Sequence, residues 1–273
     1  PIIGVEVKGS KRWLDIFFLP RLQPIELVKP FFIIVLSTLI TFDKLKNFTL
    51  KFILTLFLTL LIAFFLIIQP DLGQTLLVGF TWMILIFISG VNLVFLLTIS
   101  VLGLSLLLYF TFYVPKFEYI KNRILSFFNS ESGTHNFQSD KATDSIISGG
   151  FFGKGIGEGT LKNRVPEAHT DYIVSVISEE FGVIVIILIL ILFLTFIFSI
   201  FKKVNVEKDH KTKLILVGSA SLILFQAMIH IGVNIRLFPT TGMTLPFLSY
   251  GGSSIISISI LSGIILNLTK RKI

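Results

Sequence analysis

The chain has 273 residues, of which 53% are hydrophobic and only 15% are charged. A soluble domain carries about a quarter charged residues, so this composition excludes an ordinary soluble protein and predicts a membrane protein. The net charge of +8 does not indicate nucleic-acid binding, because the lysines and arginines gather in loops beside hydrophobic stretches, where they set membrane orientation. The absence of cysteine excludes disulfides and thiolate metal sites.

Seven stretches are apolar enough to cross a bilayer, which takes about 20 residues per helix. We therefore predict an all-α fold, a polytopic transmembrane helical bundle that forms one domain over residues 1–273. The predicted spans are 24–42, 52–68, 72–91, 93–113, 172–201, 213–235 and 243–268. Lysines concentrate in the loops 43–51 and 202–212 and in the C-terminal tail, and the positive-inside rule places these on the cytoplasmic side. The extracytoplasmic side then holds residues 1–23, 69–71, 114–171 and 236–242.

The loop 114–171 is the largest segment predicted outside the membrane. Apolar residues recur at helical spacing from Phe117 to Phe128, which predicts a helix lying on the membrane surface. The polar stretch 129–145 is expected to be mobile. Residues 148–159 contain six glycines but fail the P-loop pattern, because it requires glycine and Ser/Thr at the positions of Ser148 and Gly155. Such a loop could approach phosphates closely, although an ordinary loop is the slightly favoured interpretation.

Polar residues inside spans are costly and are functional hypotheses by default. Glu26 and Lys29 stand three residues apart at the start of the first span and can neutralise each other. A structural ion pair and a substrate site are equally compatible with this spacing. Asp71, in the tight turn 69–73, is predicted to cap the helix that follows, although its carboxylate could also help to hold a cation.

The segment 166–171, PEAHTD, leads directly into the fifth span. From spacing alone, Thr170 or Asp171 is best interpreted as the cap of that helix. Small polar residues also form a stripe on one helix face, at Asp171, Ser175, Ser178 and Gly182. Such a stripe should face a cavity or another helix rather than lipid. Asp171 would then lie at the outer mouth of such a cavity.

Gln226, His230 and Asn234 form a second stripe in the sixth span, which we interpret as hydrogen bonding between helices. The four histidines show no metal-ligand spacing. The stretch 239–254, PTTGMTLPFLSYGGSS, contains too many prolines and glycines for a simple helix. Its backbone must therefore be buried in protein or line a cavity.

These motifs together resemble the SEDS family of membrane proteins. The matching segments, in order, are QPIE with Lys29, QPDLG at 69–73, SGGFFGKGIGEGT at 148–160, PEAHTDYIVSVISEEFG at 166–182 and the stretch 239–254. GSKRWL at 9–14 resembles the segment before the fourth helix of the family, so the resemblance covers nearly the whole chain. SEDS proteins have ten transmembrane helices, and the seven predicted here are similar to helices four to ten, which implies that the first three are missing.

Individual motifs indicate which branch of the family the chain resembles and where it departs from the family pattern. GEGTLK followed by VPEAHTDYI is more similar to division-type, FtsW-like members than to elongation-type, RodA-like members. Two positions depart from the family pattern: Ile25 stands where a small residue is usual, and Gln74 where threonine is common.

The family resemblance implies a peptidoglycan glycosyltransferase of the bacterial inner membrane, with its active site facing the periplasm, that polymerises lipid II. Asp171 matches the catalytic aspartate of the family and would accept the proton of the attacking 4-hydroxyl. Lys29, with its partner Glu26, would hold the departing diphosphate, with Arg12 and Lys154 as weaker candidates. The same motifs make four further residues candidates for substrate binding: Glu167, His169, Ser249 and Tyr250.

A divalent cation, Mg or Mn, could assist the departing diphosphate, but its ligands are not readable from the sequence. The implied partners are a class B penicillin-binding transpeptidase and other membrane proteins of the division complex, with no nucleic acid. Three alternatives stay open: a lipid II flippase, an elongation-type polymerase, and a structural member of the division complex whose activity resides in a partner.

Overall fold

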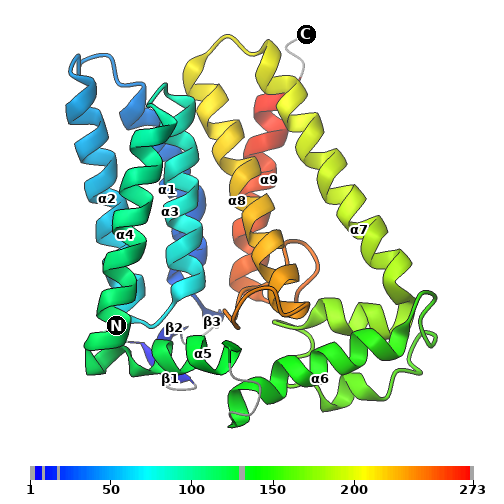
Figure 1. Cartoon of the computed structure of the whole chain (residues 1–273). Helices are drawn as coiled ribbons and strands as arrows, with labels where there is room; N and C mark the ends of the chain where they lie inside the picture. Colours follow the sequence, from blue (N-terminus) through cyan, green and yellow to red (C-terminus); the bar gives the residue numbers. More distant parts are fainter. Residues whose placement is uncertain (1–3, 8–9, 17–18, 129–132, 271–273) are drawn as a thin grey trace.

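A computed structural model describes residues 4–7, 10–16, 19–128 and 133–270. Each predicted span contains one long helix, and these helices stand side by side in one bundle (Figure 1). They are α1 (Pro24–Ile40), α2 (Phe48–Ile68), α3 (Leu72–Ile88), α4 (Leu93–Tyr113), α7 (Ile173–Val206), α8 (His210–Asn234) and α9 (Gly252–Thr269). Among the described residues, all of these except α1 and α3 are long and apolar enough to cross a membrane. The prediction of a polytopic helical membrane bundle is confirmed.

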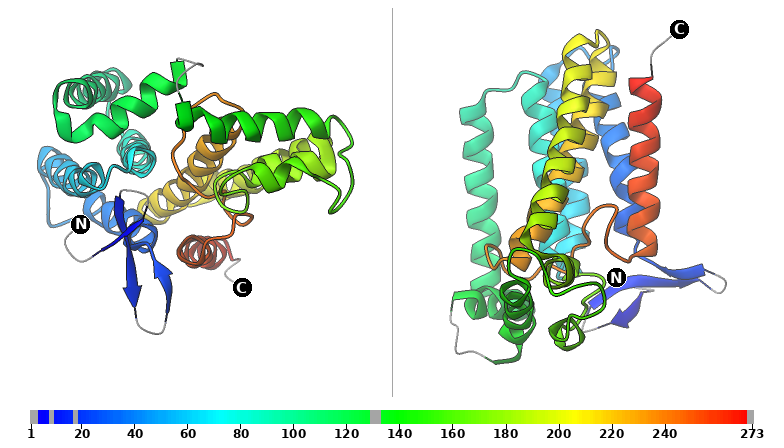
Figure 2. Two further views of the ribbon diagram at one scale, coloured as in Figure 1. Left: turned by 90° about the horizontal axis from the view of Figure 1, so that it is seen from below. Right: turned by 90° about the vertical axis from the view of Figure 1, so that its right-hand side faces the viewer.

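Two further helices lie across one end of the bundle, so the described chain has nine α-helices, where seven spans and one surface helix were predicted (Figure 2). α5 (Glu118–Phe128) confirms the predicted amphipathic helix. α6 (Gly133–Gly149) shows that the prediction of a mobile stretch at 129–145 is wrong for its described part. Its Ala142 is fully buried in a small apolar cluster with Tyr172 and Val233, and this packing holds the polar segment in a helix. Residues 129–132 lie outside the described residues.

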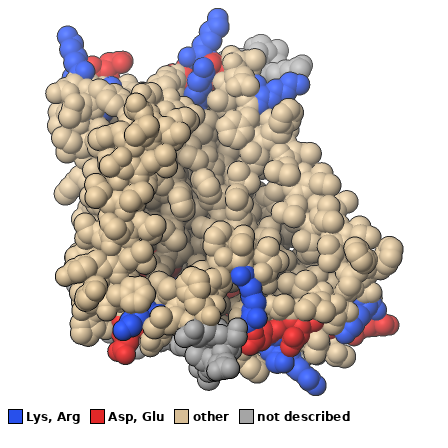
Figure 3. Space-filling view, in the orientation of Figure 1, with Lys and Arg blue, Asp and Glu red and all other residues tan. Residues whose placement is uncertain are grey.

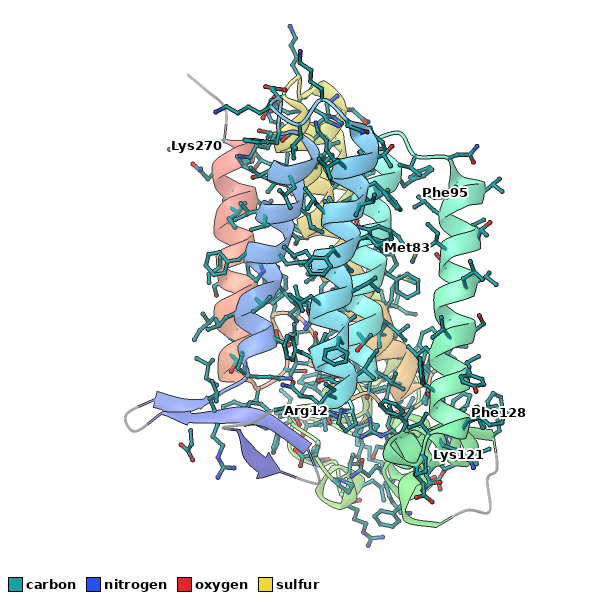
Figure 4. All side chains as sticks on the ribbon, turned by 90° about the vertical axis from the view of Figure 1, so that its left-hand side faces the viewer. Arg12, Met83, Phe95, Lys121, Phe128 and Lys270 are labelled. Atoms are coloured by element: carbon teal, nitrogen blue, oxygen red, sulfur yellow. The ribbon has the colours of Figure 1, made fainter. Side chains whose placement is uncertain are left out.

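A small antiparallel sheet precedes α1 and was not part of the all-α prediction. Its strands are β1 (Val5–Val7), β2 (Ser10–Ile16) and β3 (Leu19–Leu22), in the order β1-β2-β3. The sheet lies at the same end of the bundle as α5 and α6 (Figure 2). It positions Arg12 beside the turn between α2 and α3, as Figure 4 shows for the labelled residue.

α8 is the central helix of the bundle, whereas α4 is peripheral. Of the most apolar window of each helix, 72% is buried in α8 and 6% in α4. Small residues let neighbours approach α8 closely, as membrane helices require. A Cβ on Gly218 would lie 2.9 Å from Ile33 Cγ2 and 3.0 Å from Leu85 Cδ2. The core therefore forms around α8, against α1 and α3 on one side and against α7 and α9 on the other.

The two ends of the bundle differ. We call one the lysine end, where α1 joins α2, α7 joins α8 and α9 finishes near Lys270 (Figures 3 and 4). The other, the loop end, holds the sheet, α5, α6 and residues 235–251, which link α8 to α9 (Figure 1). That linker is irregular, with Gly242 at φ 71° and Phe247 at φ 67°, so α9 begins at Gly252 rather than at the predicted residue 243.

Candidate functional site

The PEAHTD segment forms a compact turn before α7. The backbone N–H groups of Thr170, Asp171 and Tyr172 all donate to the carbonyl of Glu167, at 3.1, 3.1 and 3.3 Å. Glu167 has a left-handed backbone, with φ 57°. The residue at the cap position of α7 is Tyr172, which makes no side-chain cap bond. The prediction that Thr170 or Asp171 caps this helix is therefore wrong.

α8 fixes the turn from one side through Asn234. The Nδ2 of Asn234 donates to the carbonyl of Asp171 at 3.1 Å. Its Oδ1 accepts the backbone N–H of Ser175 at 3.3 Å. The fully buried Asn234 thus anchors the start of α7 on both sides of Tyr172. The two polar stripes predicted on α7 and α8 meet here and face each other rather than lipid.

The α8–α9 linker fixes the same turn from another side. Ser249 Oγ donates to the carbonyl of Thr170 at 2.7 Å and accepts the N–H of Leu245 at 2.7 Å. The N–H of Tyr250 donates to the carbonyl of His169 at 2.9 Å. Two segments that the sequence identified separately are therefore one structural unit. Ser249 is buried, whereas the Tyr250 ring is exposed beside the turn.

The Asp171 carboxylate lies beside the α8–α9 linker, which a cation from α5 also contacts. A Cβ on Gly242 would come 3.6 Å from Asp171 Oδ2, so the glycine leaves space beside the carboxylate. Arg123 Nη1 donates to the carbonyl of Thr240 at 2.9 Å. Burial raises the pKa of Tyr172, the Asp171 charge raises it further, and Arg123 opposes both. Asp171 and Arg123 therefore both act electrostatically at Tyr172.

Arg123 was missed as a site residue, because the sequence indicates only that it lies within an amphipathic surface helix. The amphipathic spacing of residues 117–128 predicts a helix, and α5 confirms it. Nothing in that spacing connects residue 123 with residues 171 or 240. Only the docking of α5 against the linker brings the guanidinium to this place.

The pair Glu26 and Lys29 is buried inside the bundle. Lys29 Nζ lies 2.7 Å from Glu26 Oε2 and donates to Gln226 Oε1 of α8 at 3.0 Å. Gln74 Nε2 of α3 donates to the other carboxylate oxygen at 2.8 Å. The predicted ion pair is confirmed, and Gln74, which departs from the family pattern, is one of its partners. Because Lys29 is 0% exposed, its charge is directed inward in this structure.

The buried network continues from α8 into the linker. Gln226 Nε2 donates to the carbonyl of Thr244 at 3.0 Å, and the hydroxyls of Thr244 and Ser254 lie 2.7 Å apart. His230 Nδ1 is 2.7 Å from the carbonyl of Met243. These contacts confirm the interpretation of the α8 stripe as hydrogen bonding between segments. They also supply partners for the irregular backbone of the linker, as membrane depth requires.

Arg12 fixes the turn between α2 and α3. Its Nε and Nη2 donate to the carbonyls of Gln69 and Pro70 at 3.0 and 2.6 Å, and its Nη1 lies 3.4 Å from Asp71 Oδ2. Asp71 caps α3 as predicted, accepting the N–H of Gln74 at 3.3 Å. Burial raises the pKa of the Asp71 carboxyl, and Arg12 opposes this shift. Arg12, like Lys29, is therefore paired with a carboxylate of the same chain.

The structure does not bring Lys154 to Asp171. Lys154 Nζ lies 3.6 Å from Glu179 Oε1, which also accepts the N–H of Leu161 at 2.9 Å. Glu179 is fully buried and stands eight residues after Asp171, a rise of about 12 Å along a helix. Lys154 thus belongs to the packing of the glycine-rich segment on α7.

Metal binding receives no support from the residues present. Within the parts of the chain that the structure describes, no three His, Asp or Glu side chains gather closely enough to hold a metal ion. The predicted Mg or Mn stays a prediction without a ligand set.

The chain is similar to known proteins over its whole length. The family model FTSW_RODA_SPOVE, described as "Cell cycle protein", matches residues 1–273. The chain is 34% identical to a probable peptidoglycan glycosyltransferase FtsW of Caulobacter vibrioides, covering 100% of this chain and 68% of that protein. It is 33% identical to a protein of the same name from Trichlorobacter lovleyi, covering 98% of this chain and 71% of that one.

Solved structures with the same fold include a chain from a structure titled "Structural coordination of polymerization and crosslinking by a peptidoglycan synthase complex". That chain has a TM-score of 0.77 and 26% identity, over 99% of this chain and 76% of that one. The crystal structure of the rod shape determining protein RodA of Thermus thermophilus has a TM-score of 0.67 and 26% identity, over 98% of this chain and 72% of that one.

Proposed function

Because the chain belongs to the FtsW, RodA and SpoVE family of cell cycle proteins, we propose that it is a peptidoglycan glycosyltransferase that polymerises lipid II into glycan strands. Three relatives, matched over 98–100% of this chain and 68–72% of their own length, carry the name probable peptidoglycan glycosyltransferase FtsW. The structural observation that carries the proposal is the position of Asp171. Its backbone is held in a turn by Asn234 of α8 and Ser249 of the linker, and Gly242 leaves space beside its carboxylate.

Asp171 is the proposed general base. It accepts the proton of the acceptor 4-hydroxyl as that oxygen forms a bond to the anomeric carbon of the donor. The bond from that carbon to undecaprenyl diphosphate breaks, and the diphosphate leaves. A positioned base contributes about 10²–10⁴-fold to such a reaction, so the fixed backbone around Asp171 is the feature that matters.

The departing diphosphate needs positive charge. Arg123 is the cation that acts electrostatically at the residue next to Asp171 and bonds the linker above it. Lys29 and Arg12, the cations proposed from the family motifs, pair with Glu26 and Asp71 in this structure. Binding of the diphosphate by either would require those pairs to open. Glu167, His169 and Tyr250 border the turn and remain proposed substrate contacts.

The proposed partner is a class B penicillin-binding transpeptidase, since glycan strands must be crosslinked. The likeness to a chain from a peptidoglycan synthase complex supports it. The proposed location is the bacterial inner membrane, with the loop end facing the periplasm, which the lysines at the opposite end support. The curated relatives favour the division role, and elongation is the alternative.

The test is Asp171→Asn in the purified full chain with its transpeptidase partner and labelled lipid II. We expect polymerisation to fall by about 10²–10⁴-fold, because the amide cannot accept the proton. Asp144→Asn is the matched control, since Asp144 is an exposed acid on α6 that pairs only with Lys141 among the described contacts, and it should keep the wild-type rate.

Wild-type polymerisation by Asp171→Asn would refute the assignment of the base. If the unaltered protein with its partner translocates lipid II but forms no polymer, the flippase alternative holds instead.

A further inference from the structure

α7 is broken near the point where it should leave the hydrocarbon. Gly182 has φ 78° and ψ 176°, which interrupts the helix. From there to Lys202, residues 183–201 carry no charge. Nineteen helical residues rise about 28 Å, close to the hydrocarbon thickness of about 30 Å. The break therefore lies at the membrane boundary on the loop end.

The glycine-rich segment inserts its backbone into this break. In an unbroken helix the N–H groups of Val183 and Ile184 would donate to the carbonyls of Glu179 and Glu180. Here they donate to the carbonyls of Gly150 and Phe151, at 3.0 and 3.4 Å. The two helix carbonyls accept instead from Lys154 and Gly155, at 2.9 and 3.0 Å. The segment is thus fastened to α7 at the depth of the break.

Glycines permit this close approach. A Cβ on Gly153 would lie 2.2 Å from the carbonyl oxygen of Glu180, and one on Gly182 would lie 2.2 Å from that of Phe151. Because these contacts are with backbone, no side chain could move aside to make room. The segment cannot bind a ligand through amides that are already used on α7.

Large apolar side chains project from the fastened segment. We call them the apolar tip: Phe151, Phe152 and Ile156, which are 72%, 84% and 79% exposed. On α7, the exposed residues Ile184, Ile187 and Leu188 continue from the same level into the span. The apolar tip is therefore continuous with the lipid-facing surface of α7. Aromatic residues at this level are typical of a membrane interface.

We propose that the apolar tip inserts into the bilayer leaflet at the loop end, at the boundary between phospholipid headgroups and acyl chains. The segment 150–156 then acts as a membrane anchor for the outer part of α7, which directly follows the turn that contains Asp171. This inference rests on the fold and on the membrane boundary of α7, and it is independent of the proposed enzymatic activity.

The chain contains no cysteine, so a single cysteine can carry a spin label without other changes. The tip variant is Phe152→Cys. Leu192→Cys, at a 59% exposed position within the α7 span, is the lipid control, and Asp144→Cys on α6 is the water control. Each labelled full chain is placed in phosphatidylethanolamine and phosphatidylglycerol vesicles. Collision with oxygen, which partitions into lipid, is compared with collision with a water-soluble nickel chelate.

The proposal predicts that the Phe152 label has an oxygen-to-nickel collision ratio near that of the Leu192 label and at least several-fold above that of the Asp144 label. A ratio equal to that of the Asp144 label would refute it. Shielding from both reagents would also refute it, because a protein surface would then cover the tip. Ile156→Cys repeats the measurement if Phe152→Cys does not fold.

Discussion

Glu26 and Lys29 show how a charge is tolerated in the interior of this bundle. An unpaired charge there would cost several kcal/mol, so the pair persists only because every charged atom finds a partner. Local spacing was enough to predict the pair, since residues three apart share a helix face. Its partners Gln74 and Gln226, 48 and 197 residues away, could not be predicted, because only packing brings them close.

At this scale we predict that Lys29→Met lowers the free energy of unfolding by about 3–5 kcal/mol, because it leaves the Glu26 carboxylate buried and unpaired. The double variant Glu26→Gln with Lys29→Met should recover most of this loss, since it leaves no buried charge. Thermal unfolding of the purified variants in detergent measures both. A double variant no more stable than Lys29→Met would show that the loss arises from packing rather than from charge.

Among the elements, the contact between α6, the glycine-rich segment and α7 is one that no local sequence pattern indicated. The sequence indicated six glycines in twelve residues and left two interpretations open, a phosphate loop and an ordinary loop. Neither describes the contact in the structure, where the loop backbone replaces two hydrogen bonds of α7. α6 itself was missed because its buried face consists of small or polar residues, Ser139, Ala142 and Ser145, which give no apolar periodicity.

We predict that Gly149→Ala separates α6 from α7. The new Cβ would lie 2.0 Å from the carbonyl oxygen of Ser178 and 2.7 Å from the Cα of Glu179, and both atoms are backbone that cannot yield locally. Hydrogen–deuterium exchange should rise in residues 176–186, and the melting temperature should fall.

The matched control is Gly79→Ala in α3, where a Cβ meets no heavy atom within 4 Å. It should be neutral or stabilising by up to about 1 kcal/mol, because alanine is the better helix former. Equal exchange in both variants would mean that the α6–α7 contact does not depend on the glycine.

For the whole molecule, the lysine end and the loop end define an axis across the membrane. Charged residues lie at the two ends, and the surface between them is almost free of them in the face that Figure 3 shows. The positive-inside rule then places the loop end, with Asp171, outside the cytoplasm.

We predict that a membrane-impermeant maleimide labels Asp144→Cys in intact spheroplasts but labels Lys208→Cys only after lysis. Both positions are exposed: Asp144 lies on α6 at the loop end, and Lys208 lies between α7 and α8 at the lysine end. The absence of native cysteine keeps the background low. Labelling of Lys208→Cys alone in intact spheroplasts would invert the proposed orientation and place the site in the cytoplasm.

Features that depend on residues close together in the chain could be predicted from the sequence. They are the apolar spans, the cap at Asp71, the Glu26–Lys29 pair and the amphipathic α5. Transfer of an apolar helix into lipid, capping and i,i+3 pairing are each decided within a few residues. Tertiary structure alone decided that Asn234 and Ser249 hold the turn of Asp171, that Arg123 reaches the same place, and that residues 150–155 complete α7. Those contacts join segments far apart in the chain, so their geometry is set by how the helices pack and not by any local pattern.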